Sequence, residues 1–182
     1  MRVIAGKCKR LILNTIPGDN TRPTTDRIKE TLFNMISEEV VDSDFLDLYA
    51  GSGQIGIEAL SRYARHATFV DNNKKAIECI NNNLIKCALE DDADVINSNC
   101  LSALKRFEAD SYDIIFLDPP YNKGYEREIL EYLSESNILR EDGLIIVEAD
   151  LKSDFSYVEE LSFTIVRDKQ YKTNRHLFIR NK

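Results

Sequence analysis

A strand, a glycine-rich turn and a helix follow one another directly in the first half of the chain, and no other feature restricts the fold as strongly. Residues 45–50 (Phe-Leu-Asp-Leu-Tyr-Ala) predict a buried strand because nearly all are apolar or aromatic. The next six residues, Gly51-Ser52-Gly53-Gln54-Ile55-Gly56, follow the spacing Gly-x-Gly-x-x-Gly, and residues 57 to about 64 predict a helix. Such a turn lets a ligand approach the backbone where the first helical N–H groups lack partners. The succession therefore predicts a nucleotide-binding α/β unit.

The rest of the 182-residue chain continues to alternate between strand-like and helix-like segments. Because a helical crossover joins parallel strands, this alternation predicts an α/β, Rossmann-like fold with a mostly parallel seven-stranded sheet. A closing hairpin makes the last strand antiparallel. The further strands are expected at 67–70, 94–97, 112–117, 144–148, 163–166 and 176–179, with helices at 73–88 and 125–135, a turn at 141–143 and a basic hairpin loop at 170–175.

The first 41 residues are expected to form a small extension, and residues 42–182 one compact domain. Residues 2–5 and 11–16 predict the two short strands of a hairpin. Thr24 or Thr25 is placed to cap a helix that continues to Ile36. No apolar stretch approaches the roughly 20 residues that cross a bilayer, and no signal-peptide core is present. A cytoplasmic protein without membrane contact is therefore expected.

Positive charge is concentrated at both ends of the chain, although the net charge is −7. Residues 1–29 hold seven Lys/Arg against two acids, and residues 165–182 hold six against one. Basic ends on an acidic body predict that the ends contact a polyanion such as RNA. The candidate RNA-binding residues are Arg2, Lys7, Lys9, Arg10, Arg22, Thr24, Arg27, Lys172 and Arg175. For Arg22 and Arg27, the alternative is solvated charge at the start of a helix.

An acid at the end of the second predicted strand points to an adenosine-containing ligand. Asp71 follows Gly51 by the spacing at which such an acid accepts both ribose hydroxyls. The predicted cofactor-binding residues are Asp47, Tyr49, Ala50, Gly51, Ser52, Gly53, Asp71, Asn72, Asn99, Cys100 and Asp118. Asn99 would reach the adenine edge, but a helix cap for residues 101–107 explains it equally well.

The charges around the turn distinguish two adenosine cofactors. The pyrophosphate of NAD needs a positive cradle, whereas Asp47 and Asp118 are negative. Carboxylates attract the sulfonium and ammonium groups of S-adenosyl-L-methionine, which is therefore the predicted cofactor. An NAD-dependent oxidoreductase is the alternative, but neither His66 nor His176 follows a predicted strand beside the turn. The cysteine and histidine spacings predict no metal site.

Asp118-Pro119-Pro120-Tyr121 follows the apolar run 112–117. Two prolines cannot continue a strand ladder, so the strand ends and presents a carboxylate, a carbonyl and an aromatic ring at its carboxyl end. The Asp118 carboxylate and the Pro119 carbonyl can hold the two N–H groups of a planar exocyclic amine, and Tyr121 can stack on its ring. This predicts a catalytic clamp, formed by these four residues, for methyl transfer to a nucleobase amine. The alternative is a strand end with a Pro-Pro turn that has no catalytic role.

These motifs resemble the bacterial RsmD-type methyltransferases, which methylate a guanine exocyclic N2 in small-subunit (16S) ribosomal RNA. The resemblance rests on Arg2-Val3-Ile4-Ala5-Gly6, Arg22-Pro23-Thr24 with Asp26-Arg27, Leu46-Asp47-Leu48 with Ala50-Gly51-Ser52-Gly53, Glu58-Ala59-Leu60-Ser61-Arg62, and Asp118-Pro119-Pro120-Tyr121. It implies that Arg22 and Arg27 face RNA and that guanine, rather than adenine, is methylated. The chain differs where the family tends to have Gly, near Lys9-Arg10, at Tyr63 and near Lys172, and has Asp71 in place of Glu.

The expected protein is therefore an enzyme that methylates ribosomal RNA, as a monomer acting on the small subunit or an assembly intermediate. Two alternatives stay open at this point. One is an adenine-N6 DNA or RNA methyltransferase, because the glycine-rich turn and the Asp118 tetrapeptide are shared with such enzymes. The other is a non-catalytic ribosome assembly factor.

Overall fold

The computed structural model describes residues 1–16, 25–121 and 123–182. Its strands are β1 (Asp44–Leu48), β2 (His66–Asp71), β3 (Ala93–Asn97), β4 (Tyr112–Leu117), β5 (Leu139–Asp150), β6 (Phe163–Gln170) and β7 (Asn174–Asn181). Its α-helices are α1 (Asp26–Met35), α2 (Gln54–Ser61), α3 (Lys74–Cys87), α4 (Cys100–Leu104) and α5 (Tyr125–Glu135), and short 3-10 helices occur at Glu90–Asp92 and Ser156–Glu160.

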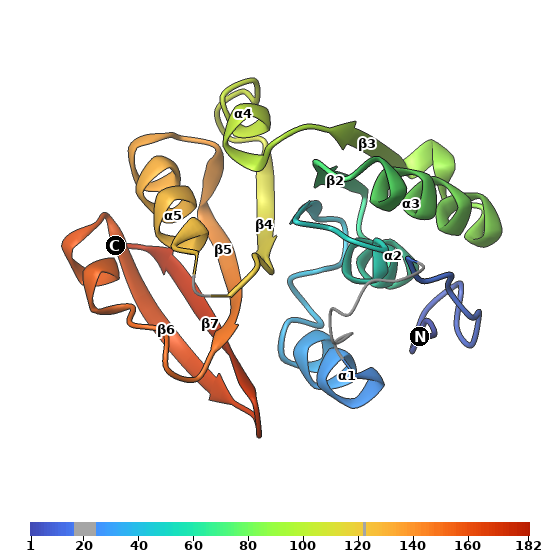
Figure 1. The fold of residues 1–182 in the computed structure, drawn as a ribbon, viewed down its shortest axis with the longest axis horizontal. Coiled ribbons are helices and arrows are strands. Elements are labelled where there is room, and N and C mark those ends of the chain that lie inside the picture. The colour runs from blue at the N-terminus through green and yellow to red at the C-terminus, as the bar shows by residue number, and fades with distance from the viewer. Residues whose placement is uncertain (17–24, 122) are drawn as a thin grey trace.

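Among the described residues, seven strands form one sheet in the order β3-β2-β1-β4-β5-β7-β6 (Figure 1). Neighbouring strands from β3 to β5 are parallel, whereas β7 is antiparallel to both β5 and β6. This confirms the predicted α/β class and the antiparallel last strand. The strand order reverses between β1 and β4, and in open α/β sheets such a switch point opens a crevice at the carboxyl ends of the strands.

Helices cover both faces of the sheet (Figure 1). On one face, α1, α2 and α3 share a hydrophobic core with Phe45, Phe69 and Phe116. On the other face, α4 and α5 share a core with Leu46 and Leu117. The central strands are thus buried on both sides, which explains their nearly continuous apolar sequences. Within the part of the chain that the structure describes, no helix is long and apolar enough to span a membrane.

Helix α2 begins at Gln54, earlier than the predicted residue 57, so that Gly56 lies in its first turn. A Cβ atom at Gly56 would lie 2.3 Å from Cε1 of Phe69, which only glycine avoids. Gly51 and Gly53 have φ angles of 56° and 76°, the left-handed conformation that glycine adopts without strain. The glycines therefore shape the turn and bring α2 close to β2.

Residues 2–5 and 11–16 do not form the regular strands predicted, but backbone hydrogen bonds join Val3 to Leu11 and Arg10, and Leu13 to Met1, so the two segments run antiparallel as in the predicted hairpin. Arg2 and Ile12 form only an isolated antiparallel bridge. The backbone N–H groups of Ile4 and Ala5 donate to the Glu58 carboxylate of α2, at 2.8 and 3.1 Å. The short hairpin is therefore also fastened to α2.

Helix α1 is tied to the same carboxylate. Thr25, one of the two predicted caps, accepts a hydrogen bond from the N–H of Ile28. The fully buried Lys29 places its Nζ 3.2 Å from Glu58 Oε2 and donates to the Arg2 carbonyl at 2.7 Å. Burial lowers the pKa of Lys29 although Glu58 opposes the shift. The boundary at residue 41 between extension and domain stays a prediction.

The C-terminal strands are longer than predicted. The turn expected at 141–143 is wrong, because these residues lie within β5. Tyr112 pairs with Leu139 and Ile114 pairs with Leu144, so residues 140–143 bulge out of the β4–β5 ladder. Strands β6 and β7 continue to Gln170 and from Asn174, which leaves a tighter hairpin turn than the predicted loop 170–175.

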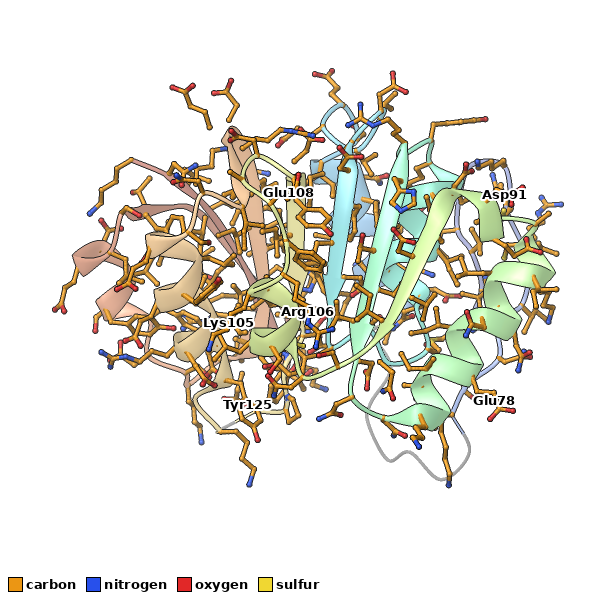
Figure 2. The ribbon with its side chains drawn as sticks, turned by 90° about the horizontal axis from the view of Figure 1, so that it is seen from above. Glu78, Asp91, Lys105, Arg106, Glu108 and Tyr125 are labelled. Carbon is orange, nitrogen blue, oxygen red and sulfur yellow. The ribbon has the colours of Figure 1, made fainter. Side chains whose placement is uncertain are left out.

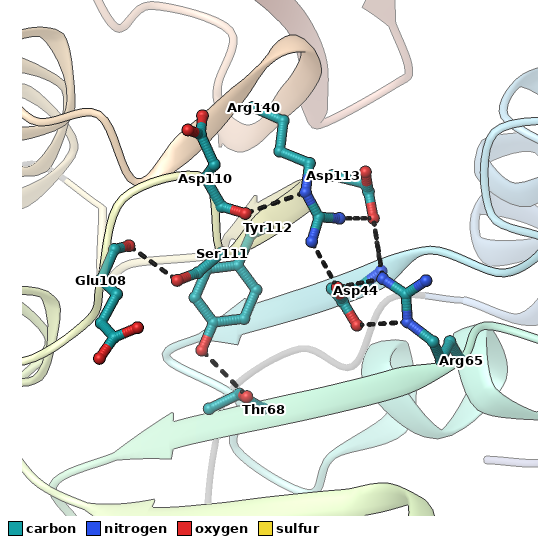
Figure 3. Close-up of polar contacts among 9 residues, drawn as sticks. All are labelled: Asp44, Arg65, Thr68, Glu108, Asp110, Ser111, Tyr112, Asp113 and Arg140. Atoms are coloured by element: carbon teal, nitrogen blue, oxygen red, sulfur yellow. Dashed lines mark hydrogen bonds and ion pairs between the residues drawn. The ribbon is translucent and has the colours of Figure 1, made fainter.

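Paired charges hold the amino ends of the central strands together (Figure 3). Arg140 donates to Asp44 at 2.8 Å and also pairs with Asp113. Arg65 pairs with Asp44 from the loop before β2. Burial opposes ionisation of Asp44, but hydrogen bonds from Arg65 and Arg140 outweigh it and lower the pKa of Asp44. We call Asp44, Arg65, Asp113 and Arg140 the amino-edge network.

Candidate active site

A cavity of about 780 Å³ opens at the carboxyl ends of β1, β4 and β5. Its wall combines the β1–α2 turn, the end of β2, the Asp118 tetrapeptide and the start of β7, and residues from the N-terminal segment and α1 complete it. In Figure 2, Tyr125 and Glu78 lie toward this edge of the sheet, and Glu108 and Asp91 lie toward the amino edge. The volume suits a small-molecule or cofactor site. The glycine-rich turn and the tetrapeptide, which are far apart in the sequence, thus face one cavity.

The glycine-rich turn is held open by two aspartates. Asp71 Oδ2 accepts the N–H of Gly51 at 2.9 Å, and Asp47 Oδ2 accepts the N–H of Gly56 at 2.9 Å. Tyr49, just before the turn, has a φ angle of 60°, which strains a residue with a side chain. Its ring stacks on Tyr125 with 6.1 Å between centroids. The turn therefore has a fixed shape before any ligand arrives.

Acidic side chains crowd this cavity. Burial, with the nearby charge of Asp71, raises the pKa of Asp47 to about 8 despite the hydrogen bond from Gly56. Burial and then the carboxylates of Glu148 and Asp47 raise the pKa of Asp118 well above its ordinary value. Each carboxylate is thus destabilised by burial and by its neighbours. A cationic ligand would relieve this repulsion, so the cavity fits the sulfonium and ammonium groups of S-adenosyl-L-methionine and opposes a pyrophosphate.

The tetrapeptide continues β4 out of the sheet. The backbone N–H of Asp118 makes a long contact, 3.5 Å, with the Leu48 carbonyl of β1. Pro119 is buried, whereas Pro120 is exposed and Tyr121 is 39% exposed. The Tyr121 hydroxyl donates to Glu148 Oε1 at 3.4 Å. The carboxylate and the aromatic ring therefore both reach the cavity wall, as the prediction of an amine clamp requires.

Sequence reasoning missed a polar cluster behind the tetrapeptide. Glu148 is buried near the end of β5, and β7 brings Asn174 and His176 against it. Asn174 Nδ2 donates to Glu148 Oε1 at 2.5 Å, and His176 Nε2 lies 3.1 Å from Glu148 Oε2. Glu148 and Asn174 line the cavity. The available signal was Glu148 itself, because an acid directly after an apolar run is the pattern that singled out Asp118.

Most of the predicted cofactor-binding residues meet in the cavity wall. Asp47, Tyr49, Ala50, Gly51, Ser52, Asp71, Asn72 and Asp118 line it, whereas Gly53, Asn99 and Cys100, which the structure also describes, do not. Asn99 caps α4 by accepting the N–H of Ser102 at 3.3 Å, as its alternative interpretation held. Burial raises the pKa of the Cys100 thiol to about 12, and this thiol contacts the backbone of Tyr49.

The predicted RNA-binding residues are dispersed. Arg22 and Thr24 lie outside the described residues. Arg2 pairs with Asp26 at 2.8 Å, and Lys7 pairs with Asp92 at 3.1 Å.

The remaining candidates differ in exposure. Lys9, Arg10, Arg27 and Lys172 are exposed. Arg175 instead packs over the Phe155 ring and pairs with Asp168 at 3.2 Å. No contact of these side chains distinguishes an RNA-binding role from a structural one, so the roles stay predictions.

Comparisons with known proteins place this chain in a family. The family described as conserved hypothetical protein 95 matches residues 1–180. The ribosomal RNA small subunit methyltransferase D of Haemophilus influenzae is 36% identical over 93% of this chain and 88% of its own. The structure of the yhhF protein of Escherichia coli superposes with a TM-score of 0.85 at 32% identity, over 100% of this chain and 98% of that one.

A more distant structure, SMU.776, shares the fold and is complexed with S-adenosylhomocysteine (TM-score 0.63, 18% identity, 81% of this chain and 48% of that one). The family match and the identity to curated methyltransferases extend over nearly the whole chain. The chain therefore belongs to the conserved hypothetical protein 95 family, the RsmD-type methyltransferases that use S-adenosyl-L-methionine.

Proposed function

We propose that this protein methylates the exocyclic N2 of a guanine in small-subunit ribosomal RNA. One observation carries the proposal: the Asp118 tetrapeptide and the glycine-rich turn line a single cavity. Relatives named ribosomal RNA small subunit methyltransferase D support the class of RNA. The resemblance described above supports guanine N2 as the acceptor.

The cofactor side of the cavity is formed by acids and backbone. S-adenosyl-L-methionine, when bound, supplies the methyl group as an electrophile. Asp71 is placed at the end of β2 to accept ribose hydroxyls, and both of its oxygens already orient backbone N–H groups, those of Gly51 and Asn73. Asp47 and Asp118 provide the negative surroundings that favour a cation.

The acceptor side holds the amine. An aromatic amine is a poor nucleophile because its lone pair is conjugated with the ring. Hydrogen bonds from its two N–H groups to the Asp118 carboxylate and the Pro119 carbonyl direct this lone pair toward the methyl group. Positioning and electrostatics supply the acceleration, and the methylated ammonium is acidic enough to lose its proton without a strong base. Tyr121 stacks on the base, which must be presented outside any RNA helix.

Basic residues border this acceptor side. Thr25 and Ile28 of the α1 start line the cavity, and Arg27 between them is exposed. Thr173 lines it from the β6–β7 turn, and the preceding Lys172 is exposed. Such residues suit contacts with the phosphates that flank a presented base. The proposed substrate is therefore the small subunit or an assembly intermediate.

Nucleoside mass spectrometry tests the proposal directly. Small subunits from cells that lack this protein are incubated with the purified protein and labelled S-adenosyl-L-methionine. Labelled N2-methylguanosine is the expected product, and its position in the RNA is mapped. Labelled N6-methyladenosine, or label only in DNA, would instead support the adenine-N6 alternative. Calorimetry that detects no binding of S-adenosyl-L-methionine would support a non-catalytic assembly factor.

A further inference from the structure

Glu148 lies directly beside Asp118 at the carboxyl edge of the sheet. Strands β4 and β5 are parallel with Leu117 opposite Val147, so the next residues, Asp118 and Glu148, are neighbours on the same face. Adjacent strands lie about 4.8 Å apart, so carboxylates on two such strands can accept hydrogen bonds from neighbouring donors of one ligand. Both residues line the cavity. An amine held at Asp118 therefore presents the rest of its ring close to Glu148.

The partners of Glu148 orient it as an acceptor. Among the described residues, Tyr121, Asn174 and His176 each bring a donor to its carboxylate, at 3.4, 2.5 and 3.1 Å. His176 donates from Nε2 when its Nδ1 accepts the hydroxyl of Tyr171, which lies 3.4 Å away. The direction of the whole chain of hydrogen bonds is then consistent. Because an ionised carboxylate only accepts hydrogen bonds, the Glu148 side chain in the cavity wall offers an acceptor, and no donor, to a ligand.

The two candidate bases differ next to the amine. In guanine, the ring atom beside the N2 amine is N1, which carries a hydrogen and donates. In adenine, the ring atom N1 beside the N6 amine has a lone pair and accepts. A carboxylate at this position attracts the N1–H of guanine and repels the N1 lone pair of adenine, because an ionised carboxylate can only accept hydrogen bonds. The 4% exposure of Glu148 leaves little water to screen the difference.

We infer that Glu148 determines base specificity by accepting the N1–H of the guanine whose N2 amine is held by Asp118. This inference rests on the proposed function, because it assumes that a purine amine occupies the Asp118 tetrapeptide. It adds a contact that the tetrapeptide motif does not contain. The network of Asn174, His176 and Tyr171 then acts by positioning this carboxylate.

The base 2-aminopurine removes the proposed contact. It keeps the 2-amino group of guanine but lacks O6 and has a lone pair at N1, so the variant Glu148→Gln is needed to assign a preference to N1. Small subunits are reconstituted with RNA ligated to carry guanine or 2-aminopurine at the mapped target position, and kcat/KM is measured for each. The wild-type protein is expected to prefer guanine by roughly 10- to 100-fold, the discrimination of a good base-edge contact.

The variant Glu148→Gln tests the assignment to this residue. It keeps the shape of the side chain but loses the charge and one acceptor oxygen, so the preference for guanine is expected to fall below about 3-fold. Asp150→Asn is the matched control, because it removes the same charge two residues later on β5 from a side chain that does not line the cavity. This control is expected to keep the wild-type preference.

The outcomes distinguish a failure of the proposed function from a failure of the Glu148 inference. If the wild-type protein methylates neither RNA, the proposed function fails and the inference fails with it. If it methylates both equally, or if Glu148→Gln lowers both rates without changing their ratio, only the Glu148 inference is overturned. The wild-type ratio needs no variant, so equal rates with the two bases overturn the inference even if Glu148→Gln does not fold.

Discussion

The two edges of the sheet use the same residue type for opposite purposes. At the amino edge, Asp44 and Asp113 face arginines, and hydrogen bonds from Arg65 and Arg140 lower the pKa of Asp44 although burial opposes them. At the carboxyl edge, burial and neighbouring carboxylates raise the pKa values of Asp47 and Asp118. Paired aspartates stabilise the fold, whereas clustered aspartates destabilise it and are ready for a cationic ligand.

Within one sheet, the amino edge therefore serves stability and the carboxyl edge serves ligand binding. Charges that match inside the protein contribute to folding and leave little for a ligand. Charges that do not match are an energetic cost of the ligand-free protein, and binding of a cation removes that cost. Substitutions at the carboxyl edge should therefore change activity, and substitutions at the amino edge should change stability.

The largest effect is expected from Asp118→Ala. Loss of the carboxylate that holds the amine should lower turnover by roughly 100- to 1,000-fold, as loss of a preorganised polar contact does in other enzymes. Single-turnover methylation of small subunits measures this. Calorimetry should show that S-adenosyl-L-methionine still binds within about tenfold of the wild-type affinity. Turnover close to that of the wild type would remove Asp118 from the proposed mechanism.

Arg140→Ala should break the amino-edge network. It removes donors to Asp44, to Asp113 and to the Asp110 carbonyl, so the free energy of unfolding should fall by about 2 kcal/mol. Denaturant unfolding measures the loss, and turnover at a temperature where the variant is folded should be unchanged. Arg127→Ala is the control, because it breaks the exposed pair with Glu131 and should cost much less. Equal losses in both variants would contradict the contrast between network and surface pair.

Asp47→Asn should stabilise the protein in a pH-dependent way. The pKa of Asp47 is about 8 in the fold against an ordinary 3.8, so the wild type loses stability as the pH rises between these values. Asparagine can still accept the N–H of Gly56 and has no charge to bury. The gain should be small near pH 4 and grow as the pH rises toward 8, and Tm measured across this range checks it. A gain that does not vary with pH would exclude the ionisation of Asp47 as its cause.

The smallest effect concerns two strained tyrosines. Tyr63, in the loop that leads to the amino edge, has a φ angle of 72° and is 59% exposed. Tyr63→Gly should relieve this strain and raise the free energy of unfolding by about 0.5 kcal/mol after the entropy cost of glycine. Turnover should not change. Tyr49→Gly, at the carboxyl edge, should instead lower turnover, because it also removes the ring that stacks on Tyr125. Equal turnover in both variants would contradict a functional role for the Tyr49 ring.

The sequence predicted the elements whose ends are chemically marked. Strand β4 and helix α5 have the predicted bounds, because Pro119-Pro120 must end the strand and Gly124 precedes the helix in a left-handed conformation. Strands β6 and β7 extend beyond their predictions because their ends are charged residues, such as Arg167 and Lys169, on an exposed edge. Their polarity suggested a loop, but backbone pairing with the neighbouring strand does not depend on side-chain polarity.

The candidate site could likewise be predicted from the sequence only in part. Asp47, Asp71 and Asp118 could be placed together from sequence, because each ends or interrupts a parallel strand and such strands end at one edge. Asn174 and His176 reach Glu148 only through the antiparallel pairing of β5 with β7. That pairing depends on register between distant segments, and no local motif encodes it.

The order of the strands along the chain also determines which parts of the cavity can form first during synthesis on the ribosome. The glycine-rich turn and Asp71 are synthesised early, and β1 can pair with β2 as soon as both have emerged. The wall made by Glu148, Asn174 and His176 requires β7, which at roughly 5 to 20 residues per second emerges several seconds later. A nascent chain of this protein therefore acquires its donor pocket before it acquires the surface that would choose a base.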